Sequence, residues 1–217
     1  MTVETKPKTA RGRERKGAII EVAAALMYER GVRATGLQDV LAESRSGKSQ
    51  FYHYFSSKDE LVAAVLEYQL MIVLGELEEF RVDTWKGIRS WFDALLDGQE
   101  QRGFKGCPVG SLSIELSAGD RCMQGRVADA FSRWETALAR AFAAMKARRS
   151  LDTSTQPQTL AETTLAAIQG GYLLSTVHHD IAPMRTTLAA AYTELRAARP
   201  AAISRPEPST PCAPSIR

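Results

Sequence analysis

Hydrophobic residues recur at helical intervals along most of the chain. Near the N-terminus, Ile19, Ala23, Leu26 and Met27 fall at positions i, i+4, i+7 and i+8, which is the spacing of one buried helical face. Alternation of apolar and polar residues, which would indicate strands, is rare throughout. The pattern therefore predicts an all-α protein of roughly nine helices.

Signals for helix ends divide the first quarter of the chain. The first predicted helix begins at position 13 and stops at Gly31, and Thr35 is expected to cap a second helix, with Gln38 as its capping-box partner. A third, short helix is predicted over 47–55. A further Ser-x-x-Glu capping box at 57–60 opens a long fourth helix.

Further apolar repeats predict the remaining helices. Pro108 suits a first helical turn, and Asp120 can cap the helix that follows it. These helices are expected over 85–101, 108–118, 120–149, 160–179 and 183–199. The polar segment 1–12 and the segment 200–217, which is rich in Pro, Ser and Thr, are predicted to be disordered.

Positive charge is concentrated at the N-terminal end. Residues 1–60 carry 11 Lys and Arg against 8 Asp and Glu, whereas residues 61–217 carry 17 of each kind. The cations that open the chain form a basic arm and are Lys6, Lys8, Arg11, Arg13, Arg15 and Lys16. Such asymmetry favours a polyanionic partner at this end, although a solvated charged tail has the same composition.

Composition argues against several other classes of protein. No stretch approaches the roughly 18–20 apolar residues of a membrane span, and no apolar signal segment opens the chain. The cysteines, Cys107, Cys122 and Cys212, lack paired metal-ligand spacing, and their odd number disfavours a disulfide framework. We expect a cytoplasmic protein that makes no contact with a membrane.

The segment SRSGKSQFYHYF at 44–55 has two incompatible interpretations. Its GKS at 47–49 matches the end of a phosphate-binding loop, but such a loop needs glycine at the position of Ala42. It also needs a preceding strand, whereas 37–43 has a helical pattern. A nucleotide hydrolase is therefore disfavoured, and no nucleophile–base pair or carboxylate pair indicates another enzyme.

The second interpretation is a helix-turn-helix, in which two short helices are joined by a tight turn. The predicted helices at 35–44 and 47–55 fit this unit, and their apolar positions can pack on the first helix. The second helix of such a unit enters the major groove of DNA, where its first turn meets base edges. Lys48, Ser49 and Gln50 occupy that turn, and each can form hydrogen bonds with bases.

The same region resembles the TetR family of transcriptional regulators. The resemblance rests on TGLQDV at 35–40, KSQFYHYF at 48–55 and SKDEL at 57–61. GCPVGSLSIELS and IQGGYLL, further along the chain, resemble the LmrA/YxaF-like branch. The resemblance implies a DNA-binding domain at 13–60 and a helical ligand-binding and dimerisation domain at 61–199.

The family's motif also implies which residues contact DNA. These are Thr35, Gln38, Arg45, Lys48, Ser49, Gln50, Tyr52, His53, Tyr54 and Lys58. Arg45 departs from the family pattern, which usually has glycine in the turn. Glycine adopts a positive φ without strain, whereas arginine does so at a cost of roughly 1 kcal/mol or more. Either the turn has another geometry, or Arg45 gains a phosphate contact that offsets the strain.

The resemblance further implies three partners: a palindromic double-stranded DNA operator, a small-molecule effector and a second copy of the chain. The helices at 120–149 and 160–179 are expected to form the dimer interface, and Gly170-Gly171 allow a close approach there or within one chain. Candidate effector-binding residues are Trp91, Phe92, Phe104, Met123, Phe131, Trp134, Tyr172 and His178. Aromatic residues at helical spacing belong to the core more often than to a pocket, but the scarcity of charge favours an apolar or aromatic effector.

No cofactor and no metal site are predicted. His178, His179 and Asp180 are adjacent, and neighbouring helical residues point about 100° apart, so they do not easily share one ion. The sequence thus predicts a non-enzymatic, ligand-responsive regulator, most simply a repressor. The alternative is a helical ligand-sensing or partner-binding protein with an impaired DNA-reading head. The unusual Arg45 in the turn is the reason to consider this alternative.

Overall fold

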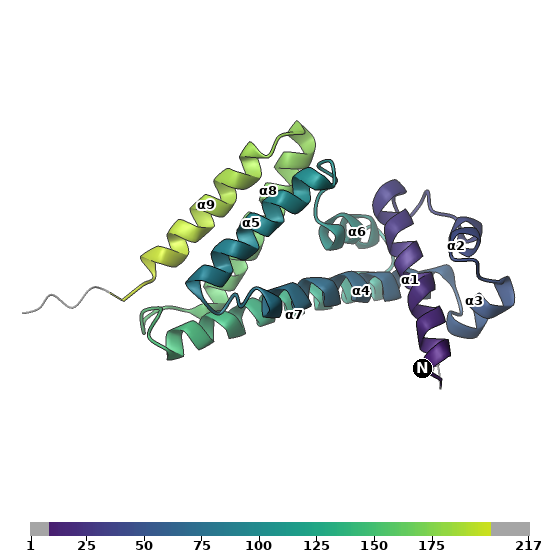
Figure 1. Cartoon of the computed structure of the whole chain (residues 1–217), viewed down its shortest axis with the longest axis horizontal. Coiled ribbons are helices and arrows are strands. Elements are labelled where there is room, and N and C mark those ends of the chain that lie inside the picture. Colours follow the sequence, from purple (N-terminus) through teal and green to yellow (C-terminus); the bar gives the residue numbers. More distant parts are fainter. Residues whose placement is uncertain (1–8, 201–217) are drawn as a thin grey trace, which may run out of the picture.

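The computed structural model describes residues 9–200, and these form nine helices without a strand, which confirms the all-α prediction (Figure 1). The helices are α1 (Ala10–Arg30), α2 (Leu37–Glu43), α3 (Lys48–Tyr54), α4 (Lys58–Glu79), α5 (Trp85–Gln101), α6 (Pro108–Ser117), α7 (Arg121–Ala147), α8 (Pro157–His178) and α9 (Ala182–Ala197). Lys6 and Lys8 of the predicted arm, and the predicted tail from position 201, lie outside the described residues.

The described chain consists of a small head and a larger helical body. α1, α2 and α3 cluster at one end, and α4 leads from this head into the body, where it runs beside α7 (Figure 1). α8 packs between α7 and α9, and α6 contacts α1, α4 and α7. α6 is therefore one part of the body that touches the head directly. Among residues 9–200 no helix is long and apolar enough to cross a membrane.

One apolar core holds the head together. Ile19 and Ala23 of α1, Val40 of α2 and Phe51 of α3 are each at most 1% exposed, as is Leu61 at the start of α4. These residues come from the predicted helical faces, and burying each large apolar side chain stabilises the fold by about 1.5–3 kcal/mol. The helical periodicity of the sequence is thus explained by this packing.

Three helix starts differ from the prediction by two or more residues, and one of them is that of α8, which begins at Pro157 instead of 160. α1 begins at Ala10, three residues before the expected start, so the end of the predicted arm is helical. α2 begins after Gly36, whose N–H donates to the Asp39 carboxylate at 2.9 Å. Thr35 is fully buried, and its hydroxyl donates to the Gly31 carbonyl at 2.8 Å. The prediction that Thr35 caps α2 is therefore wrong, because its hydroxyl satisfies a free carbonyl at the end of α1 instead.

The predicted signals at Gly31, Ser57 and Asp120 are confirmed. The Ser57 hydroxyl accepts from the Glu60 N–H at 3.1 Å, and the Asp120 carboxylate accepts from the Met123 N–H at 2.9 Å. Gly31 follows α1 with a φ of 87°, a conformation that glycine adopts without strain. At 57–60 the capping box is only half formed, because the Glu60 carboxylate accepts from Ser56.

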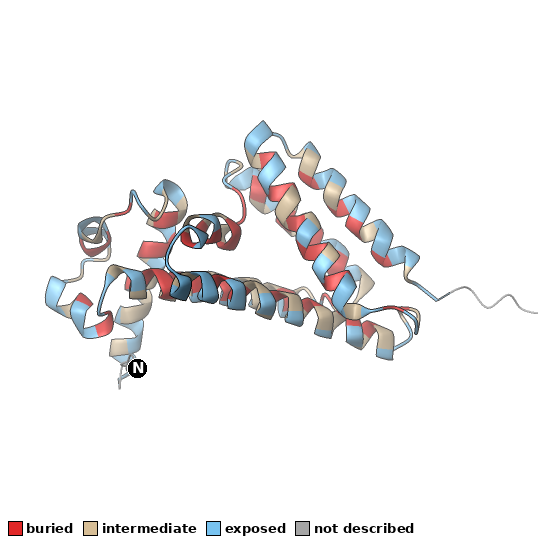
Figure 2. Cartoon of the chain, turned by 180° about the vertical axis from the view of Figure 1, so that it is seen from behind, coloured by how far each residue is buried: buried red, intermediate tan, exposed pale blue. Residues whose placement is uncertain are grey.

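Gly171 allows α8 and α9 to pack closely within one chain. A Cβ atom at this position would lie 2.5 Å from Oγ1 of Thr187 and 3.1 Å from Cα of Met184. A Cβ atom at the adjacent Gly170 would meet nothing within 4 Å. The glycine pair was expected to allow a close approach either between two chains or within one chain. At Gly171 the close approach lies within one chain. Across the body, buried residues line the helix faces that meet, and exposed residues line the outward faces (Figure 2).

Candidate nucleic-acid interface

The turn between α2 and α3 has the left-handed geometry that a glycine would favour. Arg45 adopts a φ of 52°. Its N–H donates to the Ala42 carbonyl at 3.2 Å, and the Ser46 N–H donates to the Leu41 carbonyl at 3.0 Å, which together form a Schellman motif at the end of α2. Arginine thus takes the glycine conformation at this position, and the alternative of a different turn geometry is excluded. The Arg45 side chain is exposed.

α3 turns one face inward and one face outward. Phe51 and Tyr54 are buried on the inner face, and the Phe51 ring lies 5.3 Å from that of Phe55. On the outer face the side chain of Tyr52 is 53% exposed. The first turn of α3 carries exposed Lys48 and Ser49 and half-buried Gln50, and exposed His53 follows. The side chains that the sequence assigns to base contact therefore face solvent together on one short helix.

The remaining predicted DNA-contact residues surround this face. Gln38 is exposed on the first turn of α2, whereas Thr35 and Tyr54 are buried and present little side-chain surface. Lys58, at the first position of α4, is half-buried and donates from Nζ to the Val32 carbonyl at 2.9 Å. An ammonium has three donors, so Lys58 retains two for another acceptor.

Basic side chains also extend along the start of α1. Arg11, Arg13 and Arg15 are exposed, and Nζ of Lys16 lies 5.3 Å from the centre of the Phe55 ring. These residues come from the predicted basic arm, although they lie on a helix. Lys16 thereby connects the start of α1 to the end of α3.

The head is fastened to the body by polar contacts that the sequence did not predict. The Glu115 carboxylate of α6 accepts from the N–H groups of Val32 and Arg33 at 3.1 and 3.3 Å. The Tyr28 hydroxyl of α1 donates to the Gly106 carbonyl at 2.8 Å. A change in α6 or in the loop before it therefore acts on the end of α1 and on the loop that leads to α2.

Comparison with known proteins agrees with this geometry. Residues 19–65 match the model of the bacterial regulatory proteins of the tetR family, and residues 84–190 match the C-terminal domain of LmrA/YxaF-like transcriptional regulators. The chain is 31% identical over 176 residues to an HTH-type transcriptional regulator in the lacX 3′ region of Lactococcus lactis subsp. lactis, covering 78% of this chain and 87% of that relative. The protein belongs to the TetR family. Both the predicted family and its LmrA/YxaF-like branch are thus confirmed.

Other relatives and solved structures agree with the TetR-family assignment. The transcriptional repressor DhaR of Mycobacterium sp. strain GP1 is 24% identical over 173 residues, covering 76% of this chain and 84% of DhaR. The reduced form of Escherichia coli NemR superposes with a TM-score of 0.72 at 22% identity, covering 83% of this chain and 97% of NemR. A regulatory protein TetR from Rhodobacter sphaeroides superposes with a TM-score of 0.71 at 22% identity, covering 82% of this chain and 96% of that protein. The two structures share the fold of this TetR-family protein.

The candidate effector residues of this TetR-family regulator range from fully buried to exposed. Trp91 and Trp134 are each 1% exposed within the core of the body. Phe92 and Tyr172 are also buried, whereas Phe104, Met123 and Phe131 are half-buried and His178 is exposed at the end of α8. Their role in effector binding therefore stays a prediction.

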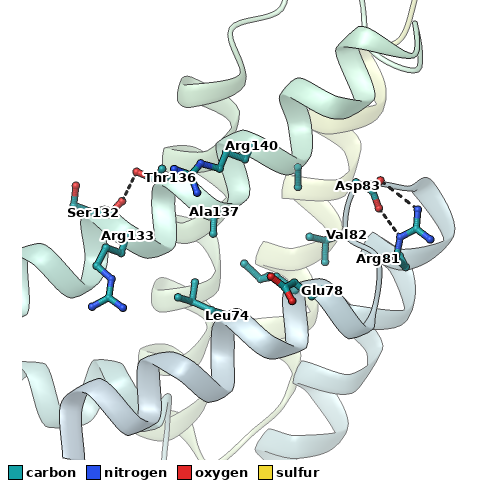
Figure 3. A pocket seen from close by; sticks show the side chains of 12 residues that line it. Leu74, Glu78, Arg81, Val82, Asp83, Ser132, Arg133, Thr136, Ala137 and Arg140 are labelled. Carbon is teal, nitrogen blue, oxygen red and sulfur yellow. Dashed lines mark hydrogen bonds and ion pairs between the residues drawn. The ribbon is translucent and has the colours of Figure 1, made fainter. Parts of the chain in front are cut away.

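A groove of about 620 Å³ lies between α4 and α7 of the regulator (Figure 3). Leu74, Leu77 and Ala137 supply apolar lining, and Arg133 and Arg140 lie along it. None of the eight candidate effector residues lines this groove. A second cleft, of about 1060 Å³, lies between the head and the start of α7, and Met123 is the one candidate among its lining residues.

Proposed function

We propose that this protein is a transcriptional repressor that binds a palindromic operator as a homodimer and leaves it when a small molecule binds the helical body. The observation that carries the proposal is the outward polar face of α3, presented beside a Schellman turn on a rigid head. Membership of the TetR family supports DNA-binding regulation, and the name of DhaR as a repressor supports the direction of control.

The proposed DNA contacts follow from chemistry and exposure. Lys48 and Gln50 read base edges, since lysine donates to guanine and glutamine pairs with adenine. Tyr52, two residues after Gln50 on the exposed face of α3, lines the groove, and His53 contacts phosphate. Lys58 uses its free donors on a phosphate at the N-terminus of α4, where the helix dipole also favours an anion. Exposed Arg45 supplies a further phosphate contact.

The proposed dimer interface is formed by α8 and α9. α8 exposes an apolar row at Leu173, Leu174 and Val177, which are 56%, 43% and 65% exposed. The outward face of α9 carries small residues, which allow close approach of a second helix pair: Ala182, Thr186, Ala189, Ala190 and Thr193. α7 is packed between α4 and α8, so we assign it a smaller share of the interface than α8 and α9. A two-fold dimer would separate the two α3 helices by about 34–36 Å or a multiple of it.

Release from DNA requires that the effector favour a different placement of the heads. The contacts of Glu115 and Tyr28 connect the body to the end of α1, so they carry this coupling. A coupling free energy of about 1–3 kcal/mol is enough to change operator affinity between about fivefold and 150-fold. The alternative of an impaired DNA-reading head has less support, since Arg45 is accommodated in the turn without disrupting it.

The experiment that tests this function is genome-wide mapping of binding sites with the purified full chain. We expect enrichment of a palindrome whose half-sites are one helical turn of DNA, or a multiple of it, apart. A double variant, Lys48→Ala with Gln50→Ala, serves as the control. Neither side chain is buried in the core of the head, so the substitutions leave that core intact. Recovery of the same sites with the double variant, or no enriched palindrome with the wild type, would contradict the proposal.

A further inference from the structure

Polar side chains from three helices and one loop converge where the body meets α1. Nη2 of Arg102, just after α5, donates to the Tyr172 hydroxyl of α8 at 3.4 Å. The Gln99 side-chain oxygen accepts from the Gly106 N–H at 3.1 Å, and Tyr28 of α1 donates to the carbonyl of the same glycine. Tyr172 is 4% exposed and Gln99 is fully buried. A few convergent polar groups among apolar helices are the kind of group that fixes the orientation of a bound ligand.

Arg102 is the cation of this cluster, and it lacks an ion-pair partner. Among residues 9–200, no carboxylate lies within 4.0 Å of its guanidinium. Its Nε is buried without a hydrogen-bond partner. The guanidinium lies over Gly98, where a Cβ atom would come within 2.8 Å of Nη1. A partly buried cation without a counter-ion is costly, and its free donors are best satisfied by an anion.

Glu76 of α4 is the acidic side chain that acts on Arg102 from beyond ion-pair distance. Burial raises the pKa of Glu76, although the Arg102 guanidinium opposes this rise. Glu76 thus loses its charge more readily than an exposed glutamate as the pH falls. Glu76 lies beyond ion-pair distance, and among residues 9–200 Nη1 of Arg102 has no hydrogen-bond partner, whereas Nη2 is shared with Tyr172.

We propose that Arg102, Tyr172 and Tyr28 form the head-group site for an effector that carries a carboxylate. This inference rests on the proposed function, because it names the chemical class of the effector. The guanidinium presents two parallel N–H donors to a carboxylate, and the two phenols add O–H donors. Burial raises the pKa of both phenols, so they remain protonated and able to donate.

The position of Tyr28 explains how such an effector reaches the head. Tyr28 belongs to α1, and its hydroxyl holds the loop before α6 through Gly106. A ligand carboxylate that accepts the Tyr28 O–H competes with this contact. Binding at Arg102 therefore loosens one of the links between head and body.

The test uses the full chain and a panel of probes at millimolar concentration: benzoate, phenylacetate and butyrate, with the matched amides as neutral controls. We expect the carboxylates to raise the melting temperature of the wild type and to weaken operator binding about fivefold or more, and the amides to do neither. Arg102→Gln and Tyr172→Phe should abolish the thermal shift. Arg89→Gln is the matched control, because Arg89 is an exposed arginine of α5, the helix that Arg102 follows, and its Nη2 donates to the Tyr192 hydroxyl at 3.5 Å.

Several results would overturn the proposal. They are an equal thermal shift of Arg102→Gln by the carboxylates, an equal shift of the wild type by the amides, and no shift by any carboxylate. If Arg102→Gln does not fold, Arg102→Lys, which keeps the charge but loses the fork, must still bind carboxylates more weakly than the wild type. Thermal shifts are measured without DNA, so they report on this site even if no operator is found. If the protein binds its operator and no carboxylate weakens this binding, the proposed effector site is refuted, whereas the proposed repressor function stands.

Discussion

Replacing Arg45 by glycine separates the strain of the turn from its contact with DNA. Arg45 has a φ of 52°, and a residue other than glycine adopts this region at a cost of roughly 1–2 kcal/mol. Glycine removes the strain, but it also gives the unfolded chain more conformational freedom, which destabilises the fold by about 0.4–1 kcal/mol. We therefore expect Arg45→Gly to raise the free energy of unfolding by about 0.5–1 kcal/mol, or the melting temperature by about 1–4 °C.

The same substitution should weaken DNA binding. If Arg45 neutralises a phosphate, its removal lowers the slope of log affinity against log salt by about 0.9 for each phosphate that is no longer neutralised. Chemical denaturation measures the stability change, and operator titrations at several salt concentrations measure the slope. Arg45→Ala should show the same decrease in affinity without the gain in stability, because alanine keeps the strain.

Arg149→Gly is the matched control for this experiment. Arg149 has a φ of 57° and ends α7 with the same motif, since its N–H donates to Lys146 and the Ser150 N–H donates to Met145, both at 2.9 Å. α7 ends at the side of the body away from the head (Figure 1). Arg149→Gly should therefore gain similar stability and leave DNA binding unchanged. Stabilisation of Arg149→Gly but not of Arg45→Gly would refute the account of strain, and an unchanged salt slope in Arg45→Gly would refute the phosphate contact.

Three further substitutions or treatments test other parts of the structure. Glu115→Gln weakens two charge-assisted hydrogen bonds to the loop before α2, and chemical denaturation should show a loss of about 1–2 kcal/mol together with weaker operator binding. Gly171→Ala should destabilise the fold by about 1–3 kcal/mol through overpacking against α9, whereas Gly170→Ala should leave monomer stability equal or higher. Iodoacetamide at neutral pH should modify exposed Cys122 before buried Cys107, because burial raises the pKa of the Cys107 thiol, and mass spectrometry of the peptides reads each site.

The outcomes that contradict these expectations are distinct. Unchanged stability of Glu115→Gln would mean that α6 does not hold the head. Equal changes in stability on substituting alanine for Gly170 and for Gly171 would contradict the close packing of α8 on α9 at Gly171. Equal labelling rates for the two thiols in the native protein would show that the environment of Cys107 is open to solvent.

The parts of the fold that the sequence predicted correctly depend on local signals. Asp120 and Ser57 mark helix starts because each side chain accepts from the N–H group three residues on. Pro108 marks one because its fixed φ suits the first helical turn. The same logic failed by one position at α2, where Thr35 and Gln38 have the spacing of a capping box. There the Asp39 carboxylate reaches the Gly36 N–H, and no local rule ranks that pair above the other.

The long-range polar contacts, both between head and body and within the body, could not be predicted in the same way. Glu115 lies 83 positions from Val32, and Arg102 lies 70 positions from Tyr172. Such pairs leave no periodic signal, because their distance depends on how whole helices pack. The aromatic character of Tyr172 makes it a candidate in the sequence, whereas Arg102 gives no such signal, since an arginine at the end of a helix resembles any solvated cation.

The central claim is that the exposed face of α3 reads DNA sequence, and competition binding tests it most directly. Purified wild type, Gln50→Ala and Tyr52→Ala are titrated against the mapped operator and against a shuffled duplex of equal length at one salt concentration. The account predicts that each variant loses about 1–3 kcal/mol of affinity for the operator and keeps its affinity for the shuffled duplex. Equal losses on both duplexes, or no loss on the operator, would contradict it.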